Sequence, residues 1–202
     1  MAERKTLYDG LGSALCGFAF IGLDIKLGSV SILPAFVGWL MISESCSMLS
    51  EERRDFALLM PLCSLMALWT FGDWLASWFG RDLDGHILFL DLLVGAVSLY
   101  LRFQFLTDMA AIASRHYAEG REDLAPRFLK WRNVQVVVVT AISLCFTVLS
   151  CLGGDAAERA NVLVMVLAVV SCAADLAVVW QLIQLRDWFR EEDAPAEKQA
   201  EG

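Results

Sequence analysis

Four aspartates interrupt long apolar stretches of this chain, and they are its first candidates for chemistry: Asp24, Asp73, Asp91 and Asp175. An ionised side chain at the centre of a membrane-spanning helix costs about 2.5–3.5 kcal/mol on insertion scales, so such a residue is a functional candidate by default. Carboxylates can bind a cation, take up a proton or pair with a base. We therefore predict ligand or proton binding at these four aspartates.

Three of the aspartates are expected at one level, in the outer half of the predicted membrane spans. Asp73 lies about 9 Å from the outer end of its stretch, Asp91 about 8 Å below the start of its own, and Asp24 near an end. One interpretation is a shared outer pocket that binds a cation or takes up protons. The other is that three shallow carboxylates reach headgroup water or pair with Lys26 and Arg81.

Asp175 differs from the other three because it lies about 22 Å below the outer end of the last apolar stretch. At that depth it must be paired or neutral, since an unpaired buried charge is expensive. Arg102 and Arg186 are expected to reach its level only by bending toward it, and a hydroxyl such as that of Ser143 could hydrogen-bond it instead. A proton relay and a structural link between helices are both open. Glu44, about one turn from an inner end, is interpreted as a solvated or arginine-paired acid.

Six apolar stretches position these acids, and each is about as long as a membrane-spanning helix. The chain of 202 residues is 57% hydrophobic and only 20% charged, and its mean hydropathy is +0.56. A spanning helix needs roughly 20 apolar residues, and a helix satisfies its own backbone groups in lipid. We therefore predict an all-α, polytopic transmembrane helical bundle in one domain, 1–190. The six predicted spans are 7–25, 30–49, 56–79, 86–106, 134–152 and 160–183.

The basic residues predict how the bundle is oriented. Of the sixteen, thirteen fall on one side of the predicted spans and three, Lys26, Arg81 and Arg159, on the other. Since Lys and Arg accumulate in cytoplasmic loops, both termini are predicted to be cytoplasmic. The first stretch runs into the second across a short turn at Lys26–Ser29, so it is expected to stay in the mature protein. The thirteen are Arg4, Lys5, Arg53, Arg54, Arg102, Arg115, Arg121, Arg127, Lys130, Arg132, Arg186, Arg190 and Lys198.

Two segments are predicted to lie outside the bilayer on the cytoplasmic side. The loop 107–133 is expected to extend the fourth helix and then to form a short helix on which Leu124, Phe128 and Trp131 share one face. That helix either lies in the headgroup layer or packs on the inner mouth of the bundle. The tail 191–202 carries five acids and one lysine and is predicted to be disordered.

Other kinds of site are not expected. The six cysteines fall within the spans without a Cys-x-x-Cys pair, which argues against thiol redox chemistry. Two histidines on opposite sides do not predict a zinc site, and no basic, aromatic-interleaved patch indicates nucleic-acid binding. We therefore expect a protein that is not an enzyme and that has no cofactor or metal. The residues concerned are Cys16, Cys46, Cys63, Cys145, Cys151, Cys172, His86 and His116.

Two neighbouring motifs carry a family resemblance: Gly17-Phe18-x-Phe20-Ile21-x-Leu23-Asp24-Ile25 and Ile32-Leu33-Pro34-x-Phe36-Val37-Gly38-Trp39. They resemble a group of small integral membrane proteins of Gram-positive bacteria, most clearly over the first two spans. An acid often follows the proline in that pattern, whereas Ala35 stands here, so a role of that acid does not carry over. The resemblance implies a multi-pass protein of the bacterial plasma membrane and no particular activity. On physical grounds, Pro34 suits an early helical position and Gly38 lets a neighbouring helix approach.

These features predict two alternative functions. The first is non-enzymatic binding or transport of a small solute or ion, with the four aspartates as its polar elements. The second is an accessory or scaffold protein that regulates a protein partner through the loop 107–133. The lipid bilayer is the partner implied by the composition, no nucleic acid is expected, and the oligomeric state is open.

Overall fold

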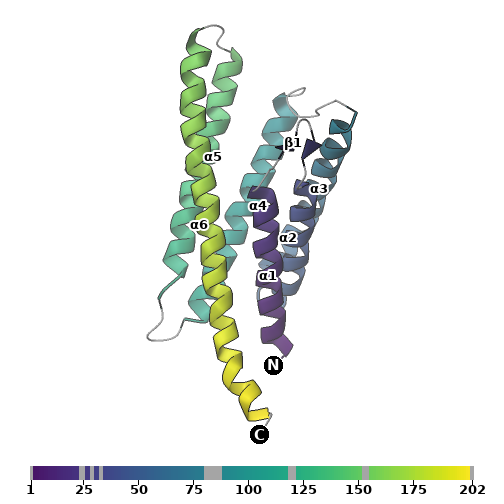
Figure 1. The fold of residues 1–202 in the computed structure, drawn as a ribbon, viewed down its shortest axis with the longest axis vertical. Coiled ribbons are helices and arrows are strands. Elements are labelled where there is room, and N and C mark those ends of the chain that lie inside the picture. The colour runs from purple at the N-terminus through teal and green to yellow at the C-terminus, as the bar shows by residue number, and fades with distance from the viewer. Residues whose placement is uncertain are drawn as a thin grey trace.

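The computed structural model describes residues 2–22, 26–27, 30–31, 34–79, 88–117, 122–151 and 155–200, and the side chains within 6–22, 34–79, 89–90, 92–117, 122–145 and 165–190. Over the described ranges the chain forms six α-helices, so the predicted all-α class is confirmed (Figure 1). The helices are α1 (Ala2–Gly22), α2 (Ala35–Leu49), α3 (Asp55–Ser77), α4 (Leu88–Arg115), α5 (Ala125–Cys151) and α6 (Asp155–Ala200).

The helices form a closed ring in chain order. Each helix packs against the next one, and α1 closes the ring by packing against α6. In Figure 1, α1 and α4 lie between the α5–α6 pair and the α2–α3 pair, and α1 begins at the end of the molecule where α6 finishes. We call this the termini end. Short connections between antiparallel neighbours produce this arrangement.

Four of the described helices are long and apolar enough to cross a membrane by length and composition. Their outward faces carry large exposed hydrophobic side chains, among them Leu68 on α3 and Val169 on α6, as expected where lipid covers a helix. The helix α2 is also apolar but has only 15 residues, or about 22 Å of rise. The four candidate segments are Asp55–Ser77, Leu92–Arg115, Ala125–Cys145 and Met165–Arg190.

The first two predicted spans extend further into the connection between them than the helices found there. The helix α1 ends at Gly22, and α2 begins at Ala35 rather than at Val30. Between them, the two-residue strands β1 (Lys26–Leu27) and β2 (Val30–Ser31) pair antiparallel. Pro34 sets the start of α2: its own backbone is extended, with φ −69° and ψ 123°, and a proline disfavours helical geometry in the residue before it.

Both ends of the segment 107–133 are helical, as the sequence predicts, because the helix α4 continues to Arg115 and α5 begins at Ala125. The second of these is not a separate short helix, since α5 runs on to Cys151. Leu124 and Phe128 are buried in the core and Trp131 packs against it, which supports packing on the inner mouth rather than in the headgroup layer. The helix α6 continues to Ala200 in place of a disordered tail, over residues rich in the good helix formers Ala, Glu, Lys and Gln.

A pair of glycines sets the distance between α1 and α2. A Cβ added at Gly17 would lie 2.9 Å from the carbonyl oxygen of Gly38, and a Cβ added at Gly38 would lie 2.8 Å from the carbonyl oxygen of Gly17. Backbone atoms cannot move aside as a flexible side chain can, so the two helices touch only because both positions lack a side chain. The structure thus confirms that Gly38 lets a neighbouring helix approach.

We predict that Gly17→Ala and Gly38→Ala each destabilise the protein by roughly 1–3 kcal/mol, because a methyl group at either position forces α1 and α2 apart. The matched control is Gly95→Ala in α4, where an added Cβ meets nothing within 4 Å. That control should be neutral or stabilising by up to about 1 kcal/mol, since Ala favours helix over Gly. Thermal unfolding of the three variants in detergent tests this; equal midpoints for all three would show that the crossing is not tight.

Candidate functional site

An ion pair between α4 and α6 forms the centre of the candidate site. The Arg102 Nη1 atom donates to Asp175 Oδ1 at 2.7 Å. From α5, Gln135 Nε2 donates to the same oxygen, also at 2.7 Å. The side chains of Arg102 and Asp175 are 16% and 19% exposed, and Gln135 is buried. Three helices therefore converge on one carboxylate, and we call these three residues the polar centre.

The polar centre lies well inside the apolar part of α6. Asp175 is about 15 Å of helix rise from Met165 and about 22 Å from Arg190, the two ends of the apolar segment. On the α1 side, Gly22 lies beside it, since a Cβ on Gly22 would be 3.8 Å from the Cβ of Asp175. At Gly22 the helix α1 therefore brings only backbone close to Asp175. The hydrogen bonds to the Asp175 carboxylate come from α4 and α5.

Of the partners that the sequence offered for Asp175, Arg102 is the one found in the structure. It reaches the carboxylate directly from the middle of α4. The hydroxyl of Ser143 donates to the carbonyl oxygen of Val139 at 3.0 Å. Sequence reasoning missed Gln135, since a screen for ionisable residues passes over a neutral amide. In the sequence, Gln135 is marked only by being a polar residue directly before four consecutive valines.

Arg186 is held elsewhere, about 16 Å farther along α6. Its Nη2 atom donates to the Tyr8 hydroxyl at 2.7 Å, and its guanidinium lies 4.2 Å from the centroid of that ring. This contact joins α6 to α1 near the termini end, where Gly12 leaves room for the guanidinium at 3.8 Å. Arg186 therefore belongs to the α1–α6 seam and not to the polar centre.

A fully buried carboxylate, Asp108, lies closer to the termini end of α4, in the segment that the sequence predicts to extend the fourth helix beyond its span. Its side chain is 0% exposed. Arg53 Nε lies 2.9 Å from Oδ1, and Gln104 Nε2 donates to Oδ1 and Oδ2 at 3.2 and 3.1 Å. Arg53 also contacts Asp55 Oδ2 at 2.7 Å. Both oxygens of Asp108 are thus occupied, and the cluster fastens the α2–α3 connection to α4.

The other predicted aspartates do not join Asp175 in the described part of the chain. The backbone of Asp91 is about 16 Å of helix rise before Arg102, and its side chain is not described. Asp73 is partly buried on α3, near the C-terminal end of that helix, and Asp24 lies outside the described residues. Their shared outer pocket stays a prediction. Glu44 is exposed, in agreement with its interpretation as a solvated acid.

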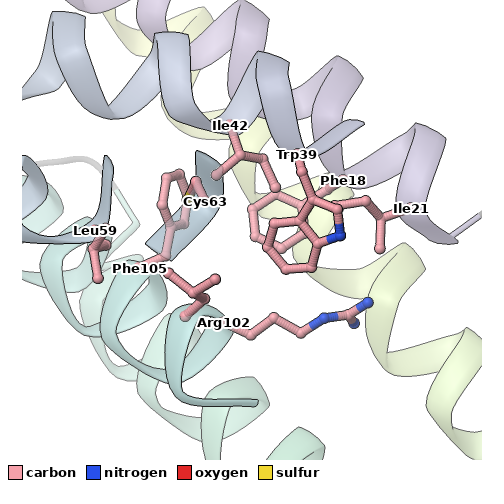
Figure 2. A pocket seen from close by; sticks show the side chains of 9 residues that line it. Phe18, Ile21, Trp39, Ile42, Leu59, Cys63, Arg102 and Phe105 are labelled. Carbon is pink, nitrogen blue, oxygen red and sulfur yellow. The ribbon is translucent and has the colours of Figure 1, made fainter. Parts of the chain in front are cut away.

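A small cavity runs beside Arg102 (Figure 2). Its free space is about 10 Å³, roughly enough for one water molecule. Figure 2 shows the aliphatic stem of Arg102 along one side of the cavity and the guanidinium reaching past it. The remaining wall is made of aromatic and aliphatic side chains and one thiol. The lining residues are Phe18, Ile21, Trp39, Ile42, Leu59, Cys63, Leu101, Arg102 and Phe105.

Buried polar atoms without a hydrogen-bond partner are concentrated on α5 and α6. They include Gln135 Oε1 beside Asp175, and Gln181 Oε1 and Gln184 Oε1 on α6. A buried acceptor without a donor typically costs about 1–3 kcal/mol. At the polar centre, therefore, one amide oxygen is free to accept a further hydrogen bond.

No protein-family model, curated protein or solved structure matches the chain. The described residues contain no group of three His, Cys, Asp or Glu side chains that could hold a metal ion. Chemically, the polar centre offers a permanent cation, a carboxylate that can take up a proton and an amide with a free acceptor. The functional assignment therefore depends on this geometry.

We predict that Arg102→Met and Asp175→Leu each destabilise the protein by about 2 kcal/mol or more, because each leaves a charge without its partner in a low-dielectric setting. The double variant Arg102→Met/Asp175→Leu should recover most of the loss, since an apolar pair of similar volume replaces the ion pair. Thermal unfolding in detergent gives the comparison. Additive losses in the double variant would show that the two side chains are not coupled.

Proposed function

We propose that the protein is an integral membrane protein that crosses the bilayer six times and binds or moves a small solute or ion at the polar centre. Four helices long and apolar enough to span a membrane support the membrane assignment. The helices α1 and α2 complete the ring between α6 and α3, and this packing supports their lying at membrane depth with those neighbours.

An orientation with both termini in the cytoplasm is part of this proposal. The first and last helices have their chain ends at the same end of the bundle, as an even number of crossings requires (Figure 1). The α2–α3 connection, with Arg53 and Arg54, and the end of α4, with Arg115, lie there too, since Arg115 contacts Glu52. Basic residues at the termini end favour its being the cytoplasmic end.

The observation that carries the function is the Arg102–Asp175 ion pair within apolar helices. An ion pair that only joined helices could be replaced by apolar residues without loss of stability, so its presence favours a further use. Gln135 supports the same conclusion, because its Oε1 atom is a buried acceptor without a donor. A solute at this place would meet a cation, a carboxylate and an amide within hydrogen-bonding reach of one another.

The alternative, an accessory protein that acts through 107–133, has less support. Most of that segment lies in α4 and α5, and Asp108, Leu124 and Phe128 within it are buried. Less of its surface is therefore free for a partner than the sequence suggested.

We predict that a reporter active only in the cytoplasm will be active when it is fused to the N-terminus and equally when it is fused to the C-terminus. A reporter active only outside the cytoplasm should stay inactive at both ends, because six crossings return the chain to its starting side. Paired fusions in a bacterial host make this measurement. An external reporter that becomes active at the C-terminus would overturn the six-span orientation.

We predict that purified protein in liposomes shows saturable solute binding or current, and that the Arg102→Met/Asp175→Leu variant loses it while remaining folded. The matched control is Arg115→Gln, which removes an exposed arginine 3.5 Å from Glu52 and far from the polar centre. Solid-supported-membrane currents and radiotracer binding over a panel of small ions and organic acids supply the readout. Equal signals from the double variant, or none from the wild type across the panel, would remove the support for this function.

A further inference from the structure

We propose that the polar centre takes up a small monocarboxylate together with one proton: the incoming anion replaces the Asp175 carboxylate on Arg102, and the proton neutralises Asp175. This inference rests on the proposed function and names its substrate class and its coupling. Its basis is the charge balance of an arginine that lies among apolar helices and contacts a single carboxylate.

Arg102 needs an anion at all times. A guanidinium does not deprotonate in proteins, so burial cannot make it neutral as it can a carboxyl group. Among the described residues, Asp175 is the carboxylate that contacts it. A competing anion would leave Asp175 charged and unpaired unless Asp175 gained a proton. With that proton, the centre carries zero net charge before and after binding, and the proton transfer from water is the only covalent change.

The geometry of Asp175 allows this protonation. Both of its hydrogen bonds, from Arg102 and from Gln135, are made to Oδ1, and no described residue donates to Oδ2. The proton can therefore bind Oδ2 while Oδ1 still accepts from Gln135. The unpartnered Oε1 of Gln135 can in turn accept from the protonated acid after the amide reorients. The Gln135 amide thus donates from its nitrogen to the ionised carboxylate and accepts with its oxygen from the protonated acid.

The charged groups around Asp175 are few. From α4 it meets Arg102, and from α1 it meets Gly22, which has no side chain. On α5, Arg132 is engaged elsewhere: it hydrogen-bonds Thr107 Oγ1 at 3.1 Å and lies 4.4 Å from the centroid of the Phe103 ring. Asp24, two positions after Gly22 in the sequence, is outside the described residues. In the described part, Arg102 is therefore the charge that Asp175 faces.

The ligand class follows from what the anion replaces and from the space beside it. A planar carboxylate matches the guanidinium fork in the way that the Asp175 carboxylate does. The cavity along the Arg102 stem has an apolar wall and about 10 Å³ of free space, roughly that of one water molecule, so there is no room beside Arg102 for a large ligand (Figure 2). Acetate, which adds only a methyl group to its carboxylate, is therefore the probe.

The test is calorimetric titration of the detergent-purified, full-length protein with sodium acetate, with sodium chloride as the salt control. Repeating the titration in two buffers of different ionisation enthalpy counts the protons exchanged. We expect uptake of about one proton for each acetate bound, and therefore an affinity that rises by up to about tenfold for each pH unit lowered.

Three variants separate the parts of this inference. Asp175→Asn should bind acetate without proton uptake and with no dependence on pH, because Arg102 then lacks a competing carboxylate. Arg102→Gln should lose binding, and the exposed Arg115→Gln should behave as the wild type. If Arg102→Gln does not fold, the Arg102→Met/Asp175→Leu variant serves in its place, with loss of binding again expected.

The possible results distinguish this inference from the proposed function. Acetate binding without proton uptake, or a pH dependence retained in Asp175→Asn, would overturn the coupling and leave the proposed function standing. Binding of another solute at the polar centre, without acetate, would overturn the ligand class alone. Absence of any solute binding would remove both.

Discussion

A guanidinium among apolar helices must keep an anion beside it, and this constraint organises half of the molecule. Arg102 cannot lose its charge, so α4 has to lie where α6 can present Asp175. The second hydrogen bond to that carboxylate, from Gln135, brings α5 to the same point. The ion pair and this hydrogen bond therefore join α4, α5 and α6 at one level of the bundle.

Close backbone contact organises the other half. Where Gly17 faces Gly38, α1 and α2 approach until a Cβ on one would meet the carbonyl oxygen of the other. Small residues provide association in lipid by allowing dense packing, without any charge. The helix α1 joins the two halves: its glycines meet α2 on one side, while Tyr8 and Gly22 meet α6 on the other. The helix α1 thus closes the ring with two kinds of contact: glycine packing against α2, and the contacts of Tyr8 and Gly22 with α6.

The sequence predicted the helical class and singled out Asp175, since hydropathy and depth can both be read from spacing. It named Arg102 as one of two arginines near Asp175 but expected either to reach the carboxylate only by bending, because hydropathy gives the depth of a residue and not which helices are neighbours. The predicted span ended at Leu106, with the helix extending beyond it, so Asp108 was placed outside the span. The structure brings Arg102 on α4 beside Asp175 on α6 and buries Asp108 against Arg53. Gln135 carries no charge, so no pattern of ionisable residues could reveal it.

The carboxylates of Asp108 on α4 and Asp175 on α6 differ in burial and in hydrogen bonding. Both oxygens of Asp108 accept hydrogen bonds and the side chain has no exposed surface, so a ligand cannot reach it without breaking the cluster. Asp175 receives both of its hydrogen bonds on Oδ1, remains 19% exposed and lies beside an amide oxygen without a donor. A buried carboxylate that only holds helices together gains from having every lone pair satisfied, since each unsatisfied polar atom weakens the structure. The incomplete hydrogen bonding around Asp175 is therefore what distinguishes a centre able to exchange its anion from the fixed link around Asp108.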